Sequence, residues 1–94
     1  MSPSRTKEPI RIYIDGALDL IHSGHYNAIR QAKLLGDKLI VGVNSDEEIL
    51  KNKGPPVLTC KERAEILRAC KWCDEVYEGT EYTVTTETLD RYNC

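Results

Sequence analysis

The two histidines of this chain, His22 and His25, lie three residues apart in the segment "DGALDLIHSGHYNAIRQA", residues 15–32. Residues at positions i and i+3 share one face of a helix, and Ser23 can act as the N-cap of a helix that runs to about Leu35. The free N–H groups and partial positive charge of a helix N-terminus attract anions. Two imidazoles there suit a triphosphate, because each can donate a hydrogen bond and take up positive charge. From position alone, a structural pair that caps or packs the helix is an equal alternative.

The segment in front of the histidines favours the close approach of a phosphate group. Residues 10–15, "IRIYID", alternate apolar with other residues and predict a strand that stops at Gly16. Glycine has no side chain, so a ligand can approach the backbone there, and the N–H groups of Ala17 and Leu18 can point at a phosphate. Gly24, between the histidines, removes a side chain that would otherwise block the phosphate.

Strand and helix patterns alternate along the rest of the chain. "KLIVGVNS" is nearly all apolar, as expected of a strand buried on both faces of a parallel sheet. "KNKGPPV" is a loop by composition, and Thr59 with Glu62 forms a capping box. The predicted elements are a strand at residues 38–45, a helix from Asp46 to Leu50, a loop from Lys51 to Val57, a helix from Thr59 to about Lys71, a strand from Cys73 to Glu78 and a helix from Thr85 to Tyr92. This order predicts an α/β fold with a doubly wound parallel sheet and right-handed crossovers.

The composition is that of a globular domain, or part of one, because 40% of the 94 residues are hydrophobic and 30% are charged. The formal net charge of -2 argues against a nucleic-acid partner and against binding to a membrane surface. No apolar run approaches the length of a membrane span, and residues 1–9 lack the apolar core of a signal peptide. We therefore expect residues 1–9 to form a flexible leader, and we expect the protein to be cytoplasmic, without stable membrane insertion.

Four cysteines include one C-x-x-C pair, Cys70 and Cys73. A zinc site would need a second pair at similar spacing, which Cys60 and Cys94 do not supply. A redox pair usually opens a helix after a strand, whereas this pair closes a predicted helix and opens a predicted strand. We interpret the pair as small buried hydrophobic residues in a reducing compartment.

The segment "DGALDLIHSGH" resembles the H-x-G-H signature of nucleotidyltransferases, and in particular the cytidylyltransferases that make CDP-alcohols. The likeness continues through residues 31–76, which carry Q-A-K, G-D-x-L-I-V-G-V, S-D-E, K-G, E-R and K-W-x-D-E-V in the order typical of that family. The resemblance implies a Rossmann-like sheet of the nucleotidyltransferase type, in which residues 10–94 form the N-terminal part of a catalytic domain. The family's later H-G-x-D and R-x-x-G-x-S-T-T segments are not in this sequence, so the resemblance implies a sheet truncated after about three strands.

Within this family, "KGPPV", "TTETL" and "RYNC" look most like the ethanolamine-phosphate cytidylyltransferases. The choline-phosphate enzymes are the nearest alternative, and they carry a tryptophan where this chain has Tyr82. A quaternary ammonium is best held against a large π face, whereas a primary ammonium donates hydrogen bonds that a tyrosine oxygen can accept. Tyr82 as a plain surface aromatic is the competing interpretation. Leu18 replaces an aromatic residue found in many relatives, which is harmless if only its backbone contacts the nucleotide.

The reaction that the resemblance implies is cytidylyl transfer from CTP to phosphoethanolamine, which gives CDP-ethanolamine and pyrophosphate. His22 and His25 would hold the triphosphate, and Lys53 would neutralise the phosphates of both substrates; Lys51 is a weaker candidate. Arg63 could hold an anionic oxygen, and an exposed helix charge is its equal alternative. Mg²⁺ on the β- and γ-phosphates is the expected cofactor.

No residue is assigned as a metal ligand, because Asp19 and Asp46 fit orienting or capping roles better. The resemblance also implies a homodimer built around "CKWCDEV", with Trp72 as an interface anchor or, alternatively, a core residue. We expect the 94 residues alone to be inactive. The residues also allow two other functions. The chain could be a nucleotide-binding half-domain that needs another chain, or it could serve adenylyl transfer from ATP.

Overall fold

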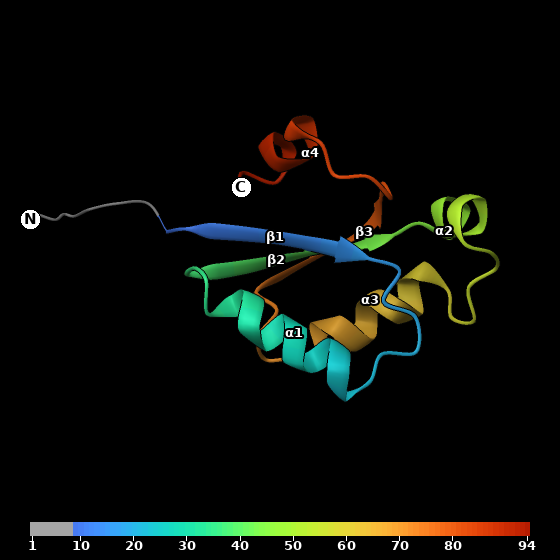
Figure 1. The fold of residues 1–94 in the computed structure, drawn as a ribbon, viewed down its shortest axis with the longest axis horizontal. Helices are drawn as coiled ribbons and strands as arrows, with labels where there is room; N and C mark the ends of the chain where they lie inside the picture. Colours follow the sequence, from blue (N-terminus) through green and yellow to red (C-terminus); the bar gives the residue numbers. More distant parts are fainter. Residues whose placement is uncertain (1–8) are drawn as a thin grey trace, which may run out of the picture.

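Three parallel strands form one sheet in the computed structural model, which describes residues 9–94 (Figure 1). The strands are β1 (Arg11–Gly16), β2 (Lys38–Asn44) and β3 (Glu75–Thr80), and β2 lies between the other two. The register pairs Ile12 with Leu39 and Val41 with Val76. The predicted leader, residues 1–9, lies outside the described residues except for Pro9. No helix among the described residues is both long and apolar enough to cross a membrane.

Four helices connect or follow the strands, namely α1 (Ser23–Lys33), α2 (Asp46–Asn52), α3 (Cys60–Arg68) and α4 (Thr86–Arg91). Local hydrogen bonds define where these helices begin. The Thr59 hydroxyl accepts the Glu62 N–H at 3.2 Å, and a Glu62 carboxylate oxygen accepts the Thr59 N–H at 2.9 Å. This is the predicted capping box. Thr85 forms a capping box with Thr88 at the start of α4, whereas at the start of α2 the Ser45 hydroxyl accepts the Glu48 N–H alone.

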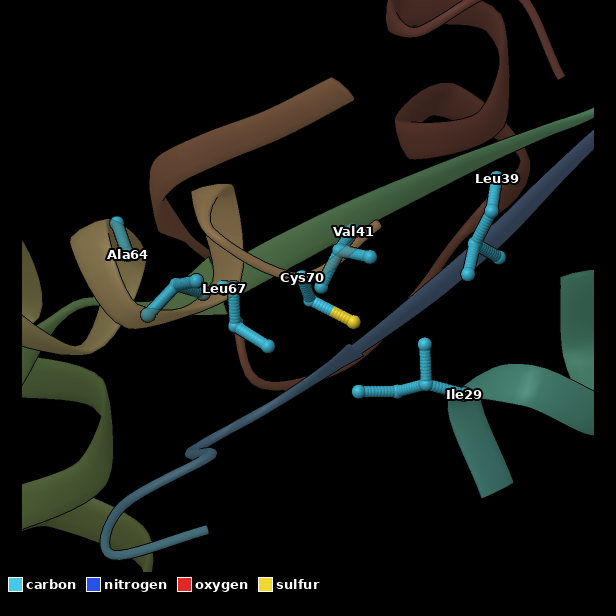
Figure 2. Packing of buried hydrophobic residues seen from close by; sticks show 7 residues of the cluster. Ile29, Leu39, Val41, Ala64, Leu67 and Cys70 are labelled. Carbon is cyan, nitrogen blue, oxygen red and sulfur yellow. The ribbon is translucent and has the colours of Figure 1, made fainter. Parts of the chain in front are cut away.

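The helices cover both faces of the sheet. In Figure 1, α1 and α3 lie below the sheet and α4 lies above it. The lower face holds the hydrophobic core, in which Ile29 of α1 and Leu67 of α3 approach Leu39 and Val41 of β2 (Figure 2). On the upper face, Tyr92 stacks on Tyr13 with ring centroids 5.4 Å apart. The predicted doubly wound α/β fold is confirmed.

Several predicted boundaries are wrong, among them that of the helix predicted to end at about Lys71, which ends at Arg68. Two others have a clear physical cause. The third strand was predicted at Cys73–Glu78 but begins at Glu75, because the Asp74 carboxylate accepts the N–H of Leu39 at 2.7 Å and thereby fixes the turn in front of the strand. The helix predicted to end at Leu50 continues to Asn52, so Lys51 lies in its last turn and not in the loop. In both places a tertiary or capping contact, rather than local composition, sets the limit.

The C-x-x-C pair lies in the connection between α3 and β3, so it neither closes the helix nor opens the strand as predicted. Cys70 belongs to the buried core, and Cys73 packs against it. Burial raises the pKa of the Cys73 thiol to about 12, which keeps it protonated at neutral pH. The interpretation of this pair as packing residues agrees with that environment. Cys94, in contrast, is exposed.

Candidate active site

The two histidines cap helix α1 by a reciprocal pair of hydrogen bonds. His22 is the N-cap, and its Nδ1 accepts the N–H of Gly24 at 3.0 Å. Nδ1 of His25 accepts the N–H of His22 at 3.2 Å. Ser23 is therefore the first residue of the helix and not its cap, because the imidazole of the extended His22 reaches the same backbone donors that a serine hydroxyl would satisfy.

This capping box determines which atoms of the histidines face a ligand. A neutral imidazole whose Nδ1 accepts a hydrogen bond carries its proton on Nε2. Both rings therefore keep an Nε2–H donor outside the cap, with the ring centroids 4.4 Å apart and the planes at 62°. Helix capping and anion binding by the two histidines are therefore compatible, since capping uses one nitrogen of each ring and leaves the other available to an anion.

Gly24 is required by the His22 ring. A Cβ atom at position 24 would lie 2.8 Å from Cε1 of His22 and 3.2 Å from its Nδ1. Such contacts are too short, so a side chain at this position would push the imidazole away from the cap. The contact gives a reason for the glycine that the sequence did not reveal, in addition to the predicted access for a phosphate.

The loop between β1 and α1 contains two non-glycine residues in the left-handed region, Leu18 and Leu20, each with φ of 52°. Residues with a Cβ atom adopt this conformation only where surrounding contacts impose it. The Leu18 side chain packs against the core, which holds the turn directly after Gly16. The backbone of Ala17 and Leu18 is thus fixed beside the end of β1.

Lys53 and the β1–α1 loop line the same pocket. Lys53 is the exposed C-cap residue of α2, and it lines a cavity of about 330 Å³ together with Ala17, Asp19 and the residues that follow it, 54–56. Ala17 and Asp19 follow β1 directly, so the cavity lies at the carboxyl end of that strand. The loops at this end of the sheet are on the right in Figure 1. Ligands of doubly wound sheets bind at this end. The structure brings Ala17 and Lys53 together as predicted partners of one site.

Asp19 ties the two loops to each other. Its carboxylate accepts the N–H groups of Val57 at 2.7 Å and of Leu58 at 3.0 Å. Both carboxylate oxygens are engaged in this way, which gives Asp19 the orienting role predicted for it.

The position of Arg63 decides against one of its two predicted interpretations. The residue is fully buried at the start of α3, so the exposed helix charge is wrong. Its guanidinium donates to the carbonyl oxygens of Ala17 at 2.6 Å, Asn44 at 2.9 Å and Leu58 at 3.1 Å, and it pairs with Asp46. Ala17 follows β1, Asn44 ends β2 and Asp46 begins α2, while Leu58 lies just before α3. Arg63 therefore joins the segments that surround the pocket, and this occupies most of the donors that an anion would need.

Tyr82 follows β3 and is 37% exposed. Its backbone N–H donates to a Glu48 carboxylate oxygen at 2.9 Å, which places the residue beside α2. Tyr82 is not among the residues that line the Lys53 pocket.

The sequence reasoning missed two polar residues of β1, Tyr13 and Asp15. Within the described residues, the Tyr13 hydroxyl and Oδ2 of Asp15 are buried without a hydrogen-bond partner. Burial raises the pKa of Tyr13 to about 12 and also raises the pKa of Asp15. The signal was present in "IRIYID", because the alternation puts Tyr13 and Asp15 on one face of the strand and Ile12 and Ile14 on the other.

A family model described as cytidylyltransferase-like matches residues 13–94. The chain belongs to the cytidylyltransferase-like family. Its sequence is 61% identical over 94 residues to an ethanolamine-phosphate cytidylyltransferase of Dictyostelium discoideum, which covers all of this chain and 26% of that relative. An ethanolamine-phosphate cytidylyltransferase of Mus musculus is 53% identical over 85 residues, or 90% of this chain and 21% of the relative. The chain thus spans about a quarter of the length of these curated relatives.

Two further comparisons concern the substrate class and the fold. Choline-phosphate cytidylyltransferase 2 of Arabidopsis thaliana is 46% identical over 91 residues, or 95% of this cytidylyltransferase-like chain and 30% of the relative. The crystal structure of a lipopolysaccharide core biosynthesis protein from Thermoplasma volcanium superposes with a TM-score of 0.81 at 27% identity. The match covers 89% of this chain and 68% of that one. The nucleotidyltransferase-type sheet is therefore confirmed.

Proposed function

We propose that this cytidylyltransferase-like chain forms part of an enzyme that transfers the cytidylyl group of CTP to phosphoethanolamine. The observation that carries the proposal is the meeting of Lys53 and the β1–α1 loop in one pocket at the carboxyl end of β1. The same loop leads directly into the histidine-capped N-terminus of α1. Identities of 61% and 53% to ethanolamine-phosphate cytidylyltransferases, against 46% to a choline-phosphate relative, support phosphoethanolamine as the acceptor.

In this reaction a phosphate oxygen of phosphoethanolamine attacks the α-phosphorus of CTP, and the bond from that phosphorus to the β-phosphate oxygen breaks. CDP-ethanolamine forms and pyrophosphate leaves. Such transfers need alignment and charge neutralisation more than covalent help from the protein. The Nε2–H groups of His22 and His25 donate to the triphosphate, and the backbone at Gly16, Ala17 and Leu18 lines the approach.

Lys53 is proposed to neutralise the phosphates of both substrates, since its ammonium is exposed on the wall of the pocket. For Arg63 we replace the substrate-binding role by a positioning one, because its guanidinium already bonds to three backbone carbonyls and to Asp46. Arg63 acts on the reaction only by holding Ala17 in place.

The ammonium group of the acceptor needs a negative or π-rich partner. Tyr82 supplies an aromatic face, and the unpartnered Oδ2 of Asp15 supplies a carboxylate whose burial without a counter-charge is unfavourable. A bound ammonium would give that oxygen the partner it lacks within the described residues. We propose both residues as parts of the acceptor site.

The carboxylates beside the pocket do not fit a protein-bound Mg²⁺. Both oxygens of Asp19 accept backbone N–H groups, and Asp46 pairs with Arg63. No group of three potential ligands (histidine, cysteine, aspartate or glutamate) gathers in the described part of the chain. We therefore assign Mg²⁺ only to the phosphates of CTP, and no step of the proposed reaction passes through it.

The location and assembly of the protein are proposed from two further observations. Trp72 is only partly buried, with the Lys71 ammonium 5.2 Å from its ring centroid, and this supports an interface around "CKWCDEV" in a homodimer. The four free thiols support a reducing, cytoplasmic location.

The proposal is tested in a host enzyme, which we define as the Dictyostelium relative with its 94 matching residues replaced by this chain. Pyrophosphate release is measured with CTP, Mg²⁺ and either phosphoethanolamine or phosphocholine. We expect turnover with a preference for phosphoethanolamine, and no turnover by the 94 residues alone. A folded host enzyme that binds CTP without turnover, or that prefers phosphocholine or ATP, would contradict the proposal.

Tyr82→Trp in the same host enzyme tests the acceptor site. A larger π face favours a quaternary ammonium, so the ratio of kcat/KM values should move towards phosphocholine by about 1 kcal/mol, or roughly fivefold. Tyr77→Trp is the matched control, because Tyr77 is an exposed tyrosine within β3 that stacks with Tyr92. An unchanged ratio in the Tyr82 variant would remove that residue from the site.

A further inference from the structure

The chain turns sharply where β3 ends, and side chains from the β2–α2 segment hold it. Gly79 has φ of +77°, and the strand register shifts there, so that Thr80 pairs with Asn44. Nδ2 of Asn44 then donates to the Glu81 carbonyl at 3.0 Å and lies 3.3 Å from Oγ1 of Thr80. The next backbone donor is the Tyr82 N–H, which is held by Glu48.

Both oxygens of the Glu48 carboxylate have partners. One accepts the Tyr82 N–H at 2.9 Å, and the other lies 3.3 Å from the Lys51 ammonium. The helix itself is fixed at this point, because the Glu48 N–H donates to the Ser45 hydroxyl at 3.1 Å. The bond from Tyr82, together with Lys51, lowers the pKa of Glu48, which keeps the acceptor ionised at neutral pH.

Glu48 thereby links two parts of the site that lie far apart in the sequence. Its helix, α2, ends at the Lys53 cap, and the Tyr82 N–H is 34 residues away from Glu48 along the chain. Within residues 9–94, no other side chain forms a hydrogen bond with Tyr82, whose ring is partly exposed and whose two sequence neighbours are exposed as well. The place of Tyr82 relative to Lys53 thus depends on this one hydrogen bond and on Asn44.

We propose that Glu48 is a positioning residue that holds Tyr82 against α2 and so sets the affinity for the amino-alcohol phosphate. The inference rests on the proposed function, because it takes Tyr82 to contact the ammonium group of the acceptor. Glu48 does not touch the substrate in this assignment. It acts through the backbone of Tyr82, and the chemical requirement is an acceptor oxygen rather than a negative charge.

The test compares Glu48→Ala with Glu48→Gln in the host enzyme. The alanine variant has no acceptor, so KM for phosphoethanolamine should rise roughly 5- to 10-fold while kcat and KM for CTP stay within twofold. The glutamine variant keeps an acceptor oxygen and should restore KM to within about threefold of the parent. Glu65→Ala, which removes an exposed carboxylate from α3, is the matched control and should change none of these constants.

A second measurement separates this inference from the function on which it rests. Hydrogen exchange of the Tyr82 amide should be faster in Glu48→Ala than in the parent and Glu48→Gln proteins, whatever the substrate is. Faster exchange with an unchanged KM in Glu48→Ala, in a host where Tyr82→Ala does raise KM, would overturn the positioning role. An unchanged KM in Tyr82→Ala would instead overturn the place of Tyr82 in the proposed acceptor site. KM values for phosphoethanolamine that are raised equally in Glu48→Ala and Glu48→Gln would show that the charge of Glu48, not its hydrogen bond, matters, and would also overturn the inference.

Discussion

The carboxylate of Asp19 accepts a hydrogen bond of 2.7 Å from the backbone N–H of Val57, 38 residues further along the chain. Asp19 precedes His22 by three positions, and Val57 lies in the loop that begins at Lys53. The bond therefore couples the loop that leads to the start of α1, where we propose that the triphosphate binds, to the loop that carries the lysine. A carboxylate that accepts backbone N–H groups fixes both partners more firmly than a neutral acceptor does.

Asp19→Ala should release the lysine loop without unfolding the chain. In the host enzyme we expect kcat/KM to fall at least roughly tenfold, because misplacing a charged group near the reacting phosphates weakens alignment. Amide exchange at Val57 and Leu58 should become faster in the 94-residue chain. Asp90→Ala, which removes an exposed carboxylate from α4, is the control. Unchanged kinetics together with faster exchange would show that the loop does not take part in the reaction.

The two roles of His22 can be separated by substitution. Asparagine is a good N-cap, so His22→Asn should keep the stability of α1 while it removes the Nε2–H donor. We expect turnover of the host enzyme to fall roughly 10²-fold or more in both His22→Asn and His22→Ala. Only the alanine variant should also lose about 0.5–2 kcal/mol of unfolding free energy. Normal turnover in His22→Asn would limit His22 to its capping role.

His25→Ala should likewise reduce turnover roughly 10²-fold or more, because the variant loses one of the two imidazole donors at the helix start. Circular dichroism should remain that of the parent protein, since His25 contributes only one hydrogen bond to the cap. Parent-like kinetics with an unchanged spectrum would contradict the role of His25 in holding the triphosphate.

Asp15→Asn should stabilise the chain and impair the enzyme. Burial raises the pKa of Asp15 in the folded state, so the folded state holds this proton more tightly than the unfolded state does. The free energy of unfolding therefore falls as the pH rises from the ordinary pKa of aspartate through the raised pKa of Asp15. The charged form of Asp15 remains unfavourable at pH 7. A neutral amide removes this cost, and Tm at pH 7 should rise by a few degrees. KM for phosphoethanolamine should rise as well; a lower Tm with unchanged KM would contradict both parts.

Acid should weaken the pairing of Arg11 with Glu75. The Arg11 guanidinium, 2.8 Å from the Glu75 carboxylate, holds the pKa of that carboxyl below its usual value, and the Tyr77 hydroxyl adds to the effect. The stability from this pairing is complete above the ordinary glutamate pKa and is lost as the pH falls through the lowered value. Glu75→Gln should thus lower Tm at pH 7, and the difference from the parent should shrink towards pH 3. A difference that is constant with pH would show that the ion pair contributes nothing.

The parts of the fold that the sequence predicted depend on local patterns. The capping box of Thr59 and Glu62 spans three residues, and the buried strand "KLIVGVN" is recognisable from its run of apolar side chains. The loop after β1 was expected at a ligand site because ligands of parallel α/β sheets bind at the carboxyl ends of the strands, whereas Lys53 was expected there only from the family resemblance. These predictions needed no knowledge of contacts between distant segments.

The parts that could not be predicted depend on contacts across the chain or on rare chemistry. Arg63 bonds to Ala17, 46 residues away, and no local pattern distinguishes that arginine from an exposed one on a polar helix face. Histidine is also an uncommon N-cap, so local preferences favour Ser23 over His22 as the cap. The start of β3 was missed because the bond from Leu39 to Asp74 spans 35 residues.

The hydrogen bonds of Arg63 should constrain the arginine itself far more than the residues with which it bonds. Three of its four partners, Ala17, Asn44 and Leu58, contribute carbonyl oxygens that every amino acid possesses. Substitutions at Ala17 or Leu58 can therefore accumulate without loss of the hydrogen bonds to Arg63, provided that the backbone conformation is unchanged. The arginine has no such freedom, because a lysine has a single charged nitrogen and cannot reach carbonyls on several sides in one plane. We therefore expect substitution of Arg63 alone to be selected against strongly. Its loss would free all three loops at the carboxyl edge of the sheet at the same time.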